Sequence, residues 1–362
     1  MCKPQHTLAL VVDGHRLMDS SLKRQRLGAC ASSSGIMCAL AIDQGSSLTR
    51  ALAEAAGDDS AGDERAAEFK TTLAKHLSPE VSAILLDYRF GDACQAVCAP
   101  ETGVLRAYET DVYGGSCETV TTLPAQESVF RLAQRGADAI KLHMYYDPDA
   151  PEEENEPKRA LIERVGAECL ANDLPFLFEP LAVRRGLDSK TAAFAAVKPG
   201  IVRRSVEEFS KPGYRVDVLK IEFPVELSCV DGIKTAAGPG KAPAYTKQEA
   251  MDHFRATATA AGCPFVFLSA GVTLDEYAEG LELAGEAGVA YSGFLCGRAI
   301  WRPAINIFGQ GGVDALAQWA RTEGQAGLKR LTKIAHATAV PMIDRTANQA
   351  PSPRPAIGGM PQ

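Results

Sequence analysis

The stretch VDVLKIEFP, residues 216–224, decides how this chain is expected to fold. It is a short run of β-branched and leucine residues that Pro224 closes, and such a run predicts a buried strand. Lys220 stands near the C-terminal end of the run. A lysine is rarely buried unless a partner or a reaction uses it, although a lysine at a strand end also reaches solvent easily. The stretch alone therefore leaves two interpretations, a functional lysine and a surface lysine.

Further apolar runs of this kind alternate with helical patterns along the chain. They cover residues 36–45, 81–88, 103–109, 138–147, 174–180, 264–271 and 292–298. Continuous apolar strands indicate a parallel sheet that is covered on both faces. Eight such strands alternating with helices predict an α/β fold, a closed (β/α)8 TIM barrel. The alternative, an open doubly wound sheet, is less favoured because no GxGxxG turn follows the first strand.

The organisation of the chain is predicted from composition. We expect an N-terminal extension over residues 1–34, a barrel over 35–337, and a disordered tail rich in Pro and Gly over 338–362. Inside the barrel, the acidic segment 151–156 is predicted to be a loop that precedes a helix over 157–172.

Charge and residue usage exclude several classes of function. The 362 residues carry a net charge of −7, and mean hydropathy is −0.08. An acidic chain has no general attraction for nucleic acid or anionic membranes, and no apolar run is long enough to span a bilayer. The 10 cysteines form no CxxC pair, which predicts reduced thiols in the cytoplasm. The 6 histidines show no paired spacing, so no metal site is expected.

Barrel geometry predicts where the chemistry lies. Active residues of such barrels stand at the C-terminal ends of strands on the inward face, and strand side chains alternate. This parity brings Asp43, Lys141, Glu179 and Lys220 to one mouth. Neighbouring ammonium groups in a dry site disfavour each other's charge, so Lys220 is predicted to be a neutral amine that forms a Schiff base. A carboxylate would move the protons. The alternative is that the four charged residues form two structural ion pairs. His143 is predicted to be a barrel histidine with satisfied hydrogen bonds rather than a ligand.

The last two strands carry a separate signal. They end in Ser269–Gly271 and Cys296–Arg298, and the loops after these strands frequently bind phosphate in barrels. Glycine lets backbone N–H groups approach an anion, and arginine supplies a bidentate cation. The alternative is a pair of ordinary tight turns.

Seven segments together resemble the class I tagatose-1,6-bisphosphate aldolases. They are ALAIDQ (39–44), SAILLD (82–87), GADAIKLHMYYDPD (136–149), PKRALIERVGAECLANDLPFLFEP (157–180), VDVLKIEFPV (216–225), PFVFLSAGV (264–272) and FLCGRAIW (294–301). The resemblance implies a (β/α)8 barrel and a Schiff-base aldolase that needs no metal or cofactor. It also implies cleavage of tagatose 1,6-bisphosphate to dihydroxyacetone phosphate and glyceraldehyde 3-phosphate.

The same resemblance implies a role for each matching residue. Lys220 corresponds to the Schiff-base lysine, Glu179 to the acid/base at the C4 hydroxyl, and Asp43 and Lys141 to supporting charges. The implied substrate-binding residues are Gln44, Ser269, Gly271, Gly297 and Arg298. The expected partner is a phosphorylated ketose, with further copies of the chain as one option.

The chain departs from this family pattern after the first strand. The family reads Asp-Gln-Arg-Gly there, whereas this chain has glycine at position 45. A cation expected near the substrate's anionic end is therefore missing, which leaves the exact sugar open. The alternatives are a sulfofructose-1-phosphate aldolase or another Schiff-base barrel lyase, and a non-catalytic barrel that senses a sugar phosphate.

Overall fold

Eight parallel strands close into a barrel in chain order, which confirms the predicted (β/α)8 fold. The computed structural model describes residues 20–57, 62–110, 115–234 and 244–343. The strands are β1 (Met37–Ala41), β2 (Ala83–Leu86), β3 (Gly103–Ala107), β4 (Ala139–Tyr146), β5 (Phe176–Ala182), β6 (Val218–Ile221), β7 (Phe265–Leu268) and β8 (Gly293–Cys296). Closure is made by β8, which pairs with β1 through Met37 and Gly293.

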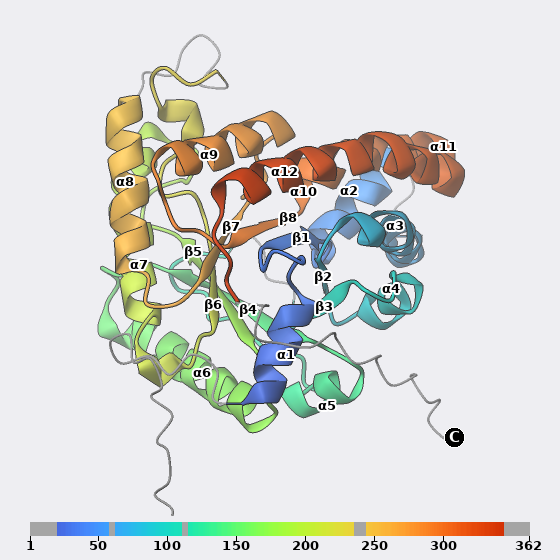
Figure 1. Ribbon diagram of the computed structural model, residues 1–362, viewed down its shortest axis with the longest axis horizontal. Helices are drawn as coiled ribbons and strands as arrows, with labels where there is room; N and C mark the ends of the chain where they lie inside the picture. The colour runs from blue at the N-terminus through green and yellow to red at the C-terminus, as the bar shows by residue number, and fades with distance from the viewer. Residues whose placement is uncertain (1–19, 58–61, 111–114, 235–243, 344–362) are drawn as a thin grey trace, which may run out of the picture.

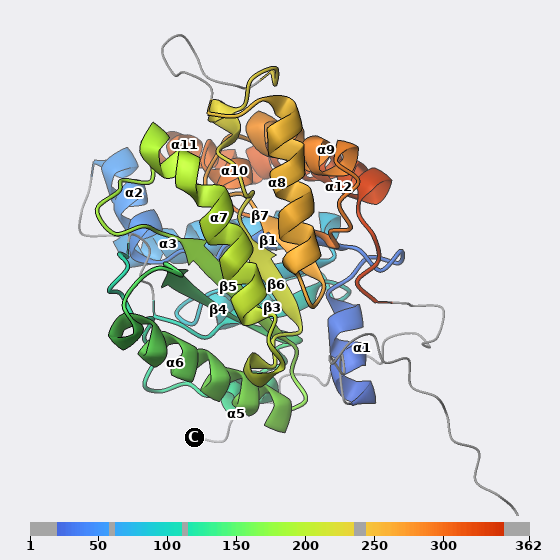
Figure 2. The same cartoon turned by 90° about the vertical axis from the view of Figure 1, so that its left-hand side faces the viewer.

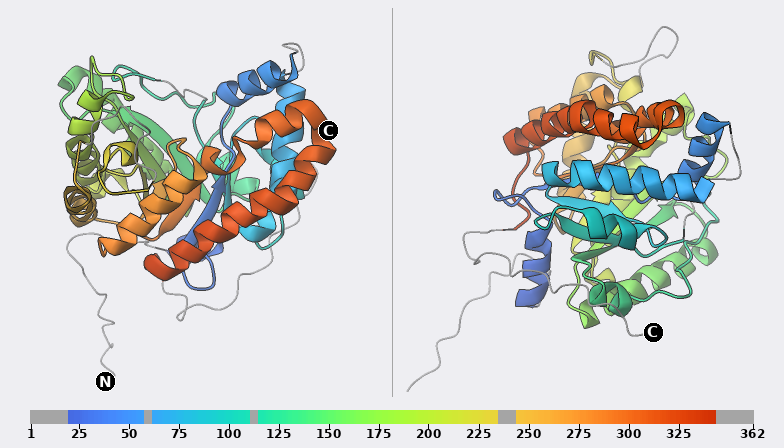
Figure 3. Two further views of the ribbon diagram at one scale, coloured as in Figure 1. Left: turned by 90° about the horizontal axis from the view of Figure 1, so that it is seen from above. Right: turned by 90° about the vertical axis from the view of Figure 1, so that its right-hand side faces the viewer.

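Helices surround the barrel, as Figures 1 and 2 show. They are α1 (Ser21–Ala29), α2 (Ser46–Ala56), α3 (Gly62–Leu77), α4 (Gly91–Val97), α5 (Val129–Gln134), α6 (Glu152–Ala171), α7 (Ala192–Phe209), α8 (Lys247–Ala260), α9 (Leu274–Glu286), α10 (Arg298–Trp301), α11 (Ala304–Trp319) and α12 (Gln325–Thr338). Helices α7 and α8 cover one side, and α3 and α4 lie on the opposite side (Figure 1). The barrel strands stand between these groups when the molecule is seen from above (Figure 3).

Local sequence explains why several helices begin where they do. Thr246 and Thr273 open α8 and α9 with capping boxes, in which Glu249 and Glu276 return a hydrogen bond to the cap. Each box satisfies backbone N–H groups that the first turn of a helix leaves without intrahelical partners. The two helices therefore begin directly after these threonines, at Lys247 and Leu274.

The acidic segment before α6 is a correction to the sequence prediction. Residues 152–156 form the first turns of α6 rather than a loop, and Pro157 lies inside the helix. Acidic side chains favour the positive end of the helix dipole, which offsets the hydrogen bond that proline cannot donate. The side chain of Asn155 also donates to the carbonyl oxygen of Asp147 at 2.9 Å, so the helix start is tied to the end of β4.

The inside of the barrel is narrow and apolar below the mouth. Small and branched side chains from all eight strands meet there, among them Ala39, Ala83, Ala139, Leu177 and Val218. These residues have the parity that the sequence predicts for the inward face. The charged residues that continue the same faces are therefore held at the C-terminal end of a packed core.

The opposite end of the barrel is closed by segments from both ends of the chain. Leu27 of α1 and Ile343, which follows α12, belong to the same apolar cluster as the barrel interior. Lys23 forms a buried ion pair with Asp217 at 2.8 Å. Residues 1–19 and 344–362 lie outside the described ranges, and with them most of the predicted tail.

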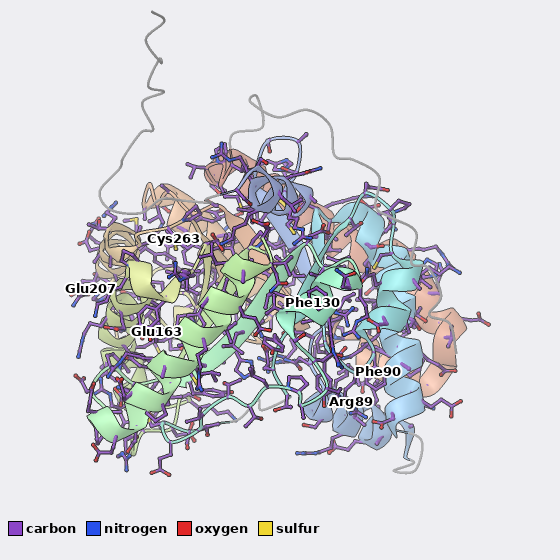
Figure 4. The ribbon with its side chains drawn as sticks, turned by 90° about the horizontal axis from the view of Figure 1, so that it is seen from below. Arg89, Phe90, Phe130, Glu163, Glu207 and Cys263 are labelled. Atoms are coloured by element: carbon purple, nitrogen blue, oxygen red, sulfur yellow. The ribbon has the colours of Figure 1, made fainter. Side chains whose placement is uncertain are left out.

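A few large apolar side chains are exposed on the outer surface. Phe130 on α5 is 58% exposed, and Arg89 stacks over the ring of Phe90 at 5.0 Å (Figure 4). Within the described ranges, no helix is both long and apolar enough to cross a membrane.

Candidate active site

Six polar residues form one charged layer at the mouth of the barrel. Each stands on an inward face, and none is more than 7% exposed. Lys141 lies within the long strand β4, level with Ala107, the last residue of β3, so the layer begins where the shorter neighbouring strand ends. The charged layer consists of Asp43 after β1, Glu109 after β3, Lys141 and His143 on β4, Glu179 on β5 and Lys220 on β6. The structure therefore brings together all four residues that the sequence predicts to be catalytic.

Lys141 lies at the centre of this layer and contacts three carboxylates. Its Nζ is 3.0 Å from Asp43 Oδ2, 2.6 Å from Glu109 Oε1 and 2.8 Å from Glu179 Oε2. A fully buried ammonium is stable only when opposite charges and hydrogen bonds replace its hydration. Lys141 therefore fixes the positions of the carboxylates as much as they fix it.

Lys220 and Glu179 form the second contact of the layer. Lys220 Nζ donates to Glu179 Oε2 at 2.8 Å, so one carboxylate oxygen serves both lysines. The register makes this contact possible, because Phe178 and Leu219 are paired and the following residues both point inward. Burial alone would raise the pKa of Glu179, but the charges of Lys141 and Lys220 outweigh it and hold the pKa below its ordinary value.

Glu109 is a residue that sequence reasoning missed. The carboxylate contacts Lys141 and also lies 3.0 Å from Nδ1 of His143. The alternation of side chains could have identified it, because Leu105, Ala107 and Glu109 lie on the same face of one strand and the residues that follow it. His143, predicted to be a barrel histidine with satisfied hydrogen bonds, is buried and contacts this carboxylate.

The third carboxylate changes the electrostatic picture of the mouth. The sequence predicts two lysines beside two carboxylates, with repulsion between the two ammonium groups as the dominant interaction. The structure instead surrounds Lys141 with Asp43, Glu109 and Glu179, so its charge is largely compensated. Lys220 therefore lies beside a group of compensated charges rather than beside an isolated ammonium.

A candidate anion site lies beside the charged layer at the ends of β7 and β8. We use this name for Ser269, Gly271, Gly297 and Arg298. The backbone N–H of Gly297 donates to Ser269 Oγ at 3.4 Å, which joins the two strand ends. A methyl group at Gly271 would lie 2.9 Å from Cζ of Arg298, so the guanidinium reaches this loop. The residues predicted to bind phosphate are therefore neighbours in space.

The loop of the anion site has an unusual backbone. Ala270 and Gly271 have φ angles of 45° and 80°, in the left-handed region. Glycine adopts this region freely, whereas alanine does so at a cost of about 1 kcal/mol or more. Trp301 Nε1 donates to the carbonyl oxygen of Ala41 at 2.8 Å, which anchors α10 to the end of β1.

Gln44 and Gly45 form the loop between β1 and α2. The side chain of Gln44 is buried and accepts a hydrogen bond from Ser47 at 3.3 Å. Gly45 is the N-cap residue of α2. Gln44 thus directly follows Asp43, and its side chain contacts the first turn of α2.

A second buried cation stands near Lys220. Lys198 on α7 contacts Glu226 at 2.5 Å and Glu222 at 3.4 Å, and Glu222 accepts the N–H of Ala182 at 2.7 Å. These contacts support the end of β6 from outside the layer.

Within residues 20–57, 62–110, 115–234 and 244–343, no group of three or more His, Cys, Asp or Glu is arranged to hold a metal ion.

Comparisons with known proteins agree with this geometry. The model of the DeoC/LacD family aldolase matches residues 37–303. The chain is 40% identical over 309 residues to a protein of Listeria monocytogenes named tagatose 1,6-diphosphate aldolase, covering 85% of this chain and 89% of that protein. It is 39% identical over 319 residues to tagatose 1,6-diphosphate aldolase 2 of Enterococcus faecalis, covering 88% and 94% of the two chains.

A solved structure supports the fold at greater distance. The fructose-bisphosphate aldolase of Plasmodium falciparum, crystallised with TRAP and a small-molecule inhibitor, superposes with a TM-score of 0.65 and 14% identity. The match covers 89% of this chain and 97% of that one. The barrel, the buried lysines of its mouth and these relatives lead to one conclusion: the chain belongs to the DeoC/LacD aldolase family and is a lyase of the aldolase type.

Proposed function

We propose that this protein is a class I aldolase that cleaves tagatose 1,6-bisphosphate to dihydroxyacetone phosphate and glyceraldehyde 3-phosphate, and that it also accepts related ketose bisphosphates. The observation that carries the mechanism is the 2.8 Å contact between Lys220 Nζ and Glu179 Oε2 in a buried site. The names of relatives at 40% and 39% identity support the substrate.

Schiff-base formation starts from the Lys220–Glu179 contact. Transfer of a proton from the ammonium to the carboxylate leaves a neutral amine, which attacks the C2 ketone of the substrate. Glu179 then supplies a proton as the carbinolamine loses water. The resulting iminium carries a positive charge where Lys220 previously carried one, so the neighbouring carboxylates stabilise it.

Bond cleavage uses the same carboxylate in its ionised form. Glu179 accepts the proton of the C4 hydroxyl while the C3–C4 electrons move toward the iminium and form an enamine. The C4 fragment leaves as glyceraldehyde 3-phosphate. Return of the proton to C3 of the enamine regenerates the iminium, and water then converts the iminium to dihydroxyacetone phosphate and the ammonium of Lys220. The water lost on imine formation is regained at this step, so the cycle balances.

Lys141, Asp43 and Glu109 hold this pair in place. Lys141 bonds the Glu179 oxygen that also faces Lys220, and Asp43 and Glu109 occupy its remaining hydrogen-bonding directions. A side chain fixed on several sides keeps its geometry through the reaction without reorganisation. We assign Lys141 and Asp43 as catalytic supports, and the anion site together with Gln44 to the substrate phosphates.

A second candidate substrate follows from Gly45. The cation that the family has at this position is absent, so the far end of the substrate meets a less positive loop. A ketose phosphate that ends in a singly charged sulfonate, sulfofructose 1-phosphate, fits that environment. Turnover of tagatose, fructose and sulfofructose phosphates under one set of conditions separates the candidates by kcat/KM.

Borohydride trapping tests the mechanism. Incubation with substrate and borohydride is expected to give a reduced adduct on Lys220, located by peptide mass spectrometry, and turnover that survives EDTA. Lys220→Met should abolish the adduct and lower kcat by at least about 10⁴-fold. Lys198→Met is the matched control, since it removes another buried lysine near the mouth. Trapping that persists in Lys220→Met, or activity that EDTA abolishes, would refute the assignment.

The cysteines bear on the compartment in which we propose that the enzyme works. The cysteines between Cys30 and Cys296 that the structure describes are free thiols, and most are buried. Scattered free thiols are typical of reducing compartments, so we place the enzyme in the cytoplasm.

A further inference from the structure

Two arginine side chains converge on one point beside the anion site. Arg298 begins α10 and Arg302 follows four residues later as its C-cap, so both lie on one helical face. A methyl group at Gly271 would be 2.8 Å from Arg302 Nη2 and 2.9 Å from Arg298 Cζ. The two guanidinium groups are therefore neighbours at the end of β7. The sequence argument used only the first of them.

This pair of cations has no counter-charge bonded to it. Among the residues that the structure describes, neither guanidinium forms an ion pair or a side-chain hydrogen bond. Burial, and after it the charge of Arg298, lowers the pKa of Arg302 from its ordinary value. Like charges one helical turn apart destabilise each other, and the charge of Glu276, which acts in the opposite direction on Arg302, offsets these effects only in part.

The acid that acts on Arg302, Glu276, forms its hydrogen bonds with another residue. Glu276 on α9 accepts hydrogen bonds from the backbone N–H and Oγ1 of Thr273 at 2.7 and 2.8 Å, as part of the capping box. Asp275, the residue before it, is paired with Arg330 of α12. Surface arginines such as Arg255, which contacts Asp252 at 2.7 Å, show the ordinary arrangement with an acidic partner.

We propose that Arg302 is a specificity-determining residue that makes the anion site selective for a dianion, and thus for a phosphate monoester over a singly charged sulfonate. Two adjacent guanidinium groups can each donate hydrogen bonds to a different oxygen of one phosphate. A phosphate monoester carries its second charge above a pKa of about 6, so the dianion dominates at neutral pH. The inference rests on the proposed function for the statement that the ligand is the phosphate of a sugar.

Direct binding tests the inference without catalysis. The probes are glycerol 3-phosphate and its sulfonate analogue 2,3-dihydroxypropane-1-sulfonate, which lack a ketone and cannot form an imine. Calorimetry on the full chain at pH 7.5 is expected to show preference for the phosphate. Arg302→Gln should weaken phosphate binding about tenfold and sulfonate binding about twofold. In the wild type, phosphate affinity should fall below pH 6 as the dianion is protonated.

Control variants separate specific recognition from general charge. Arg302→Lys keeps the positive charge but lacks the bidentate guanidinium, so it should lose part of the preference for phosphate. Arg255→Gln removes one exposed positive charge elsewhere, and it should change neither the phosphate nor the sulfonate affinity. In turnover assays Arg302→Gln should raise KM with little change in kcat, as expected when binding is lost equally in ground and transition states.

The outcomes are distinguishable from failure of the proposed function. Unchanged phosphate affinity in Arg302→Gln, or an equal loss for phosphate and sulfonate, would overturn the inference even if Lys220 forms the borohydride adduct. Absence of the adduct with phosphate selectivity intact would instead refute the aldolase mechanism and leave Arg302 as assigned.

Discussion

Replacing Lys141 by methionine is the sharpest test of the charged layer. The change keeps an unbranched side chain of similar length but leaves Asp43, Glu109 and Glu179 buried around an apolar group. With an effective dielectric constant near 20, each contact at 2.6–3.0 Å contributes roughly 6 kcal/mol of Coulomb attraction before desolvation. Desolvation and repulsion among the carboxylates offset most of this, and breaking a buried pair typically costs about 3–5 kcal/mol.

The pH dependence of stability decides whether this reasoning holds. In the wild type the pKa of Glu179 lies below its ordinary 4.5, so its stabilising contribution is present above pH 4.5 and is lost as the pH falls through the lowered value. In Lys141→Met burial dominates and raises the pKa of the carboxyls, so their ionisation opposes folding at neutral pH. The variant should therefore gain up to about 1.4 kcal/mol per pH unit for each affected carboxyl on acidification from pH 8 toward 5.

Urea unfolding across that pH range is the assay. We expect the midpoint of Lys141→Met to lie roughly 1–2 M below the wild type at pH 8 and to rise on acidification. Lys23→Met is the control, because it breaks a buried pair with one carboxylate, Asp217, at the far end of the barrel. It should reduce stability by a smaller amount and leave kcat unchanged. Parallel pH profiles of Lys141→Met and wild type would refute the argument.

Two further substitutions test individual contacts. Glu109→Gln keeps the shape of the side chain but removes one charge from Lys141, and it should lower kcat by about 10–100-fold in steady-state assays while circular dichroism stays unchanged. Wild-type kcat would show that Glu109 is only structural. Gly271→Ala and Gly288→Ala each place alanine at a positive φ, 80° and 70°, and should each cost about 1 kcal/mol by urea unfolding. The methyl group added at position 271 would contact the guanidinium groups of Arg298 and Arg302, whereas the one at position 288 would contact nothing, so only Gly271→Ala should raise KM. Equal KM values for the two variants would contradict this prediction.

Strand parity explains how much of the site the sequence could predict. Ala39, Ala41 and Asp43 alternate on one face, and the inward core is so uniformly apolar that the charged residue continuing a face must stand at the mouth. The same rule applied to the weak third strand would have found Glu109. The pattern of that strand is weaker because Arg106, on its outward face, interrupts the apolar run.

Contacts made between distant segments could not be predicted in this way. Arg302 approaches Gly271 only because a short helix follows β8 and Trp301 fixes it to Ala41. The start of α6 depends on the contact between Asn155 and the end of β4. These are tertiary interactions, and local propensity near Pro157 favours the opposite interpretation.

The loss of a cation at Gly45 leaves the charge balance of the catalytic layer intact. Asp43, two residues earlier, is already paired with Lys141 at 3.0 Å, so the layer does not depend on an arginine at position 45. Two arginines without an ion pair in the described part of the chain, Arg298 and Arg302, lie at the ends of β7 and β8, and β8 is the strand paired with β1. In the proposed function, imine chemistry depends on Lys220 and Glu179, and we expect the choice of the distal substrate group to depend on other residues. Sequence drift at Gly45 can therefore change the preferred sugar while the contact between Lys220 and Glu179 is preserved.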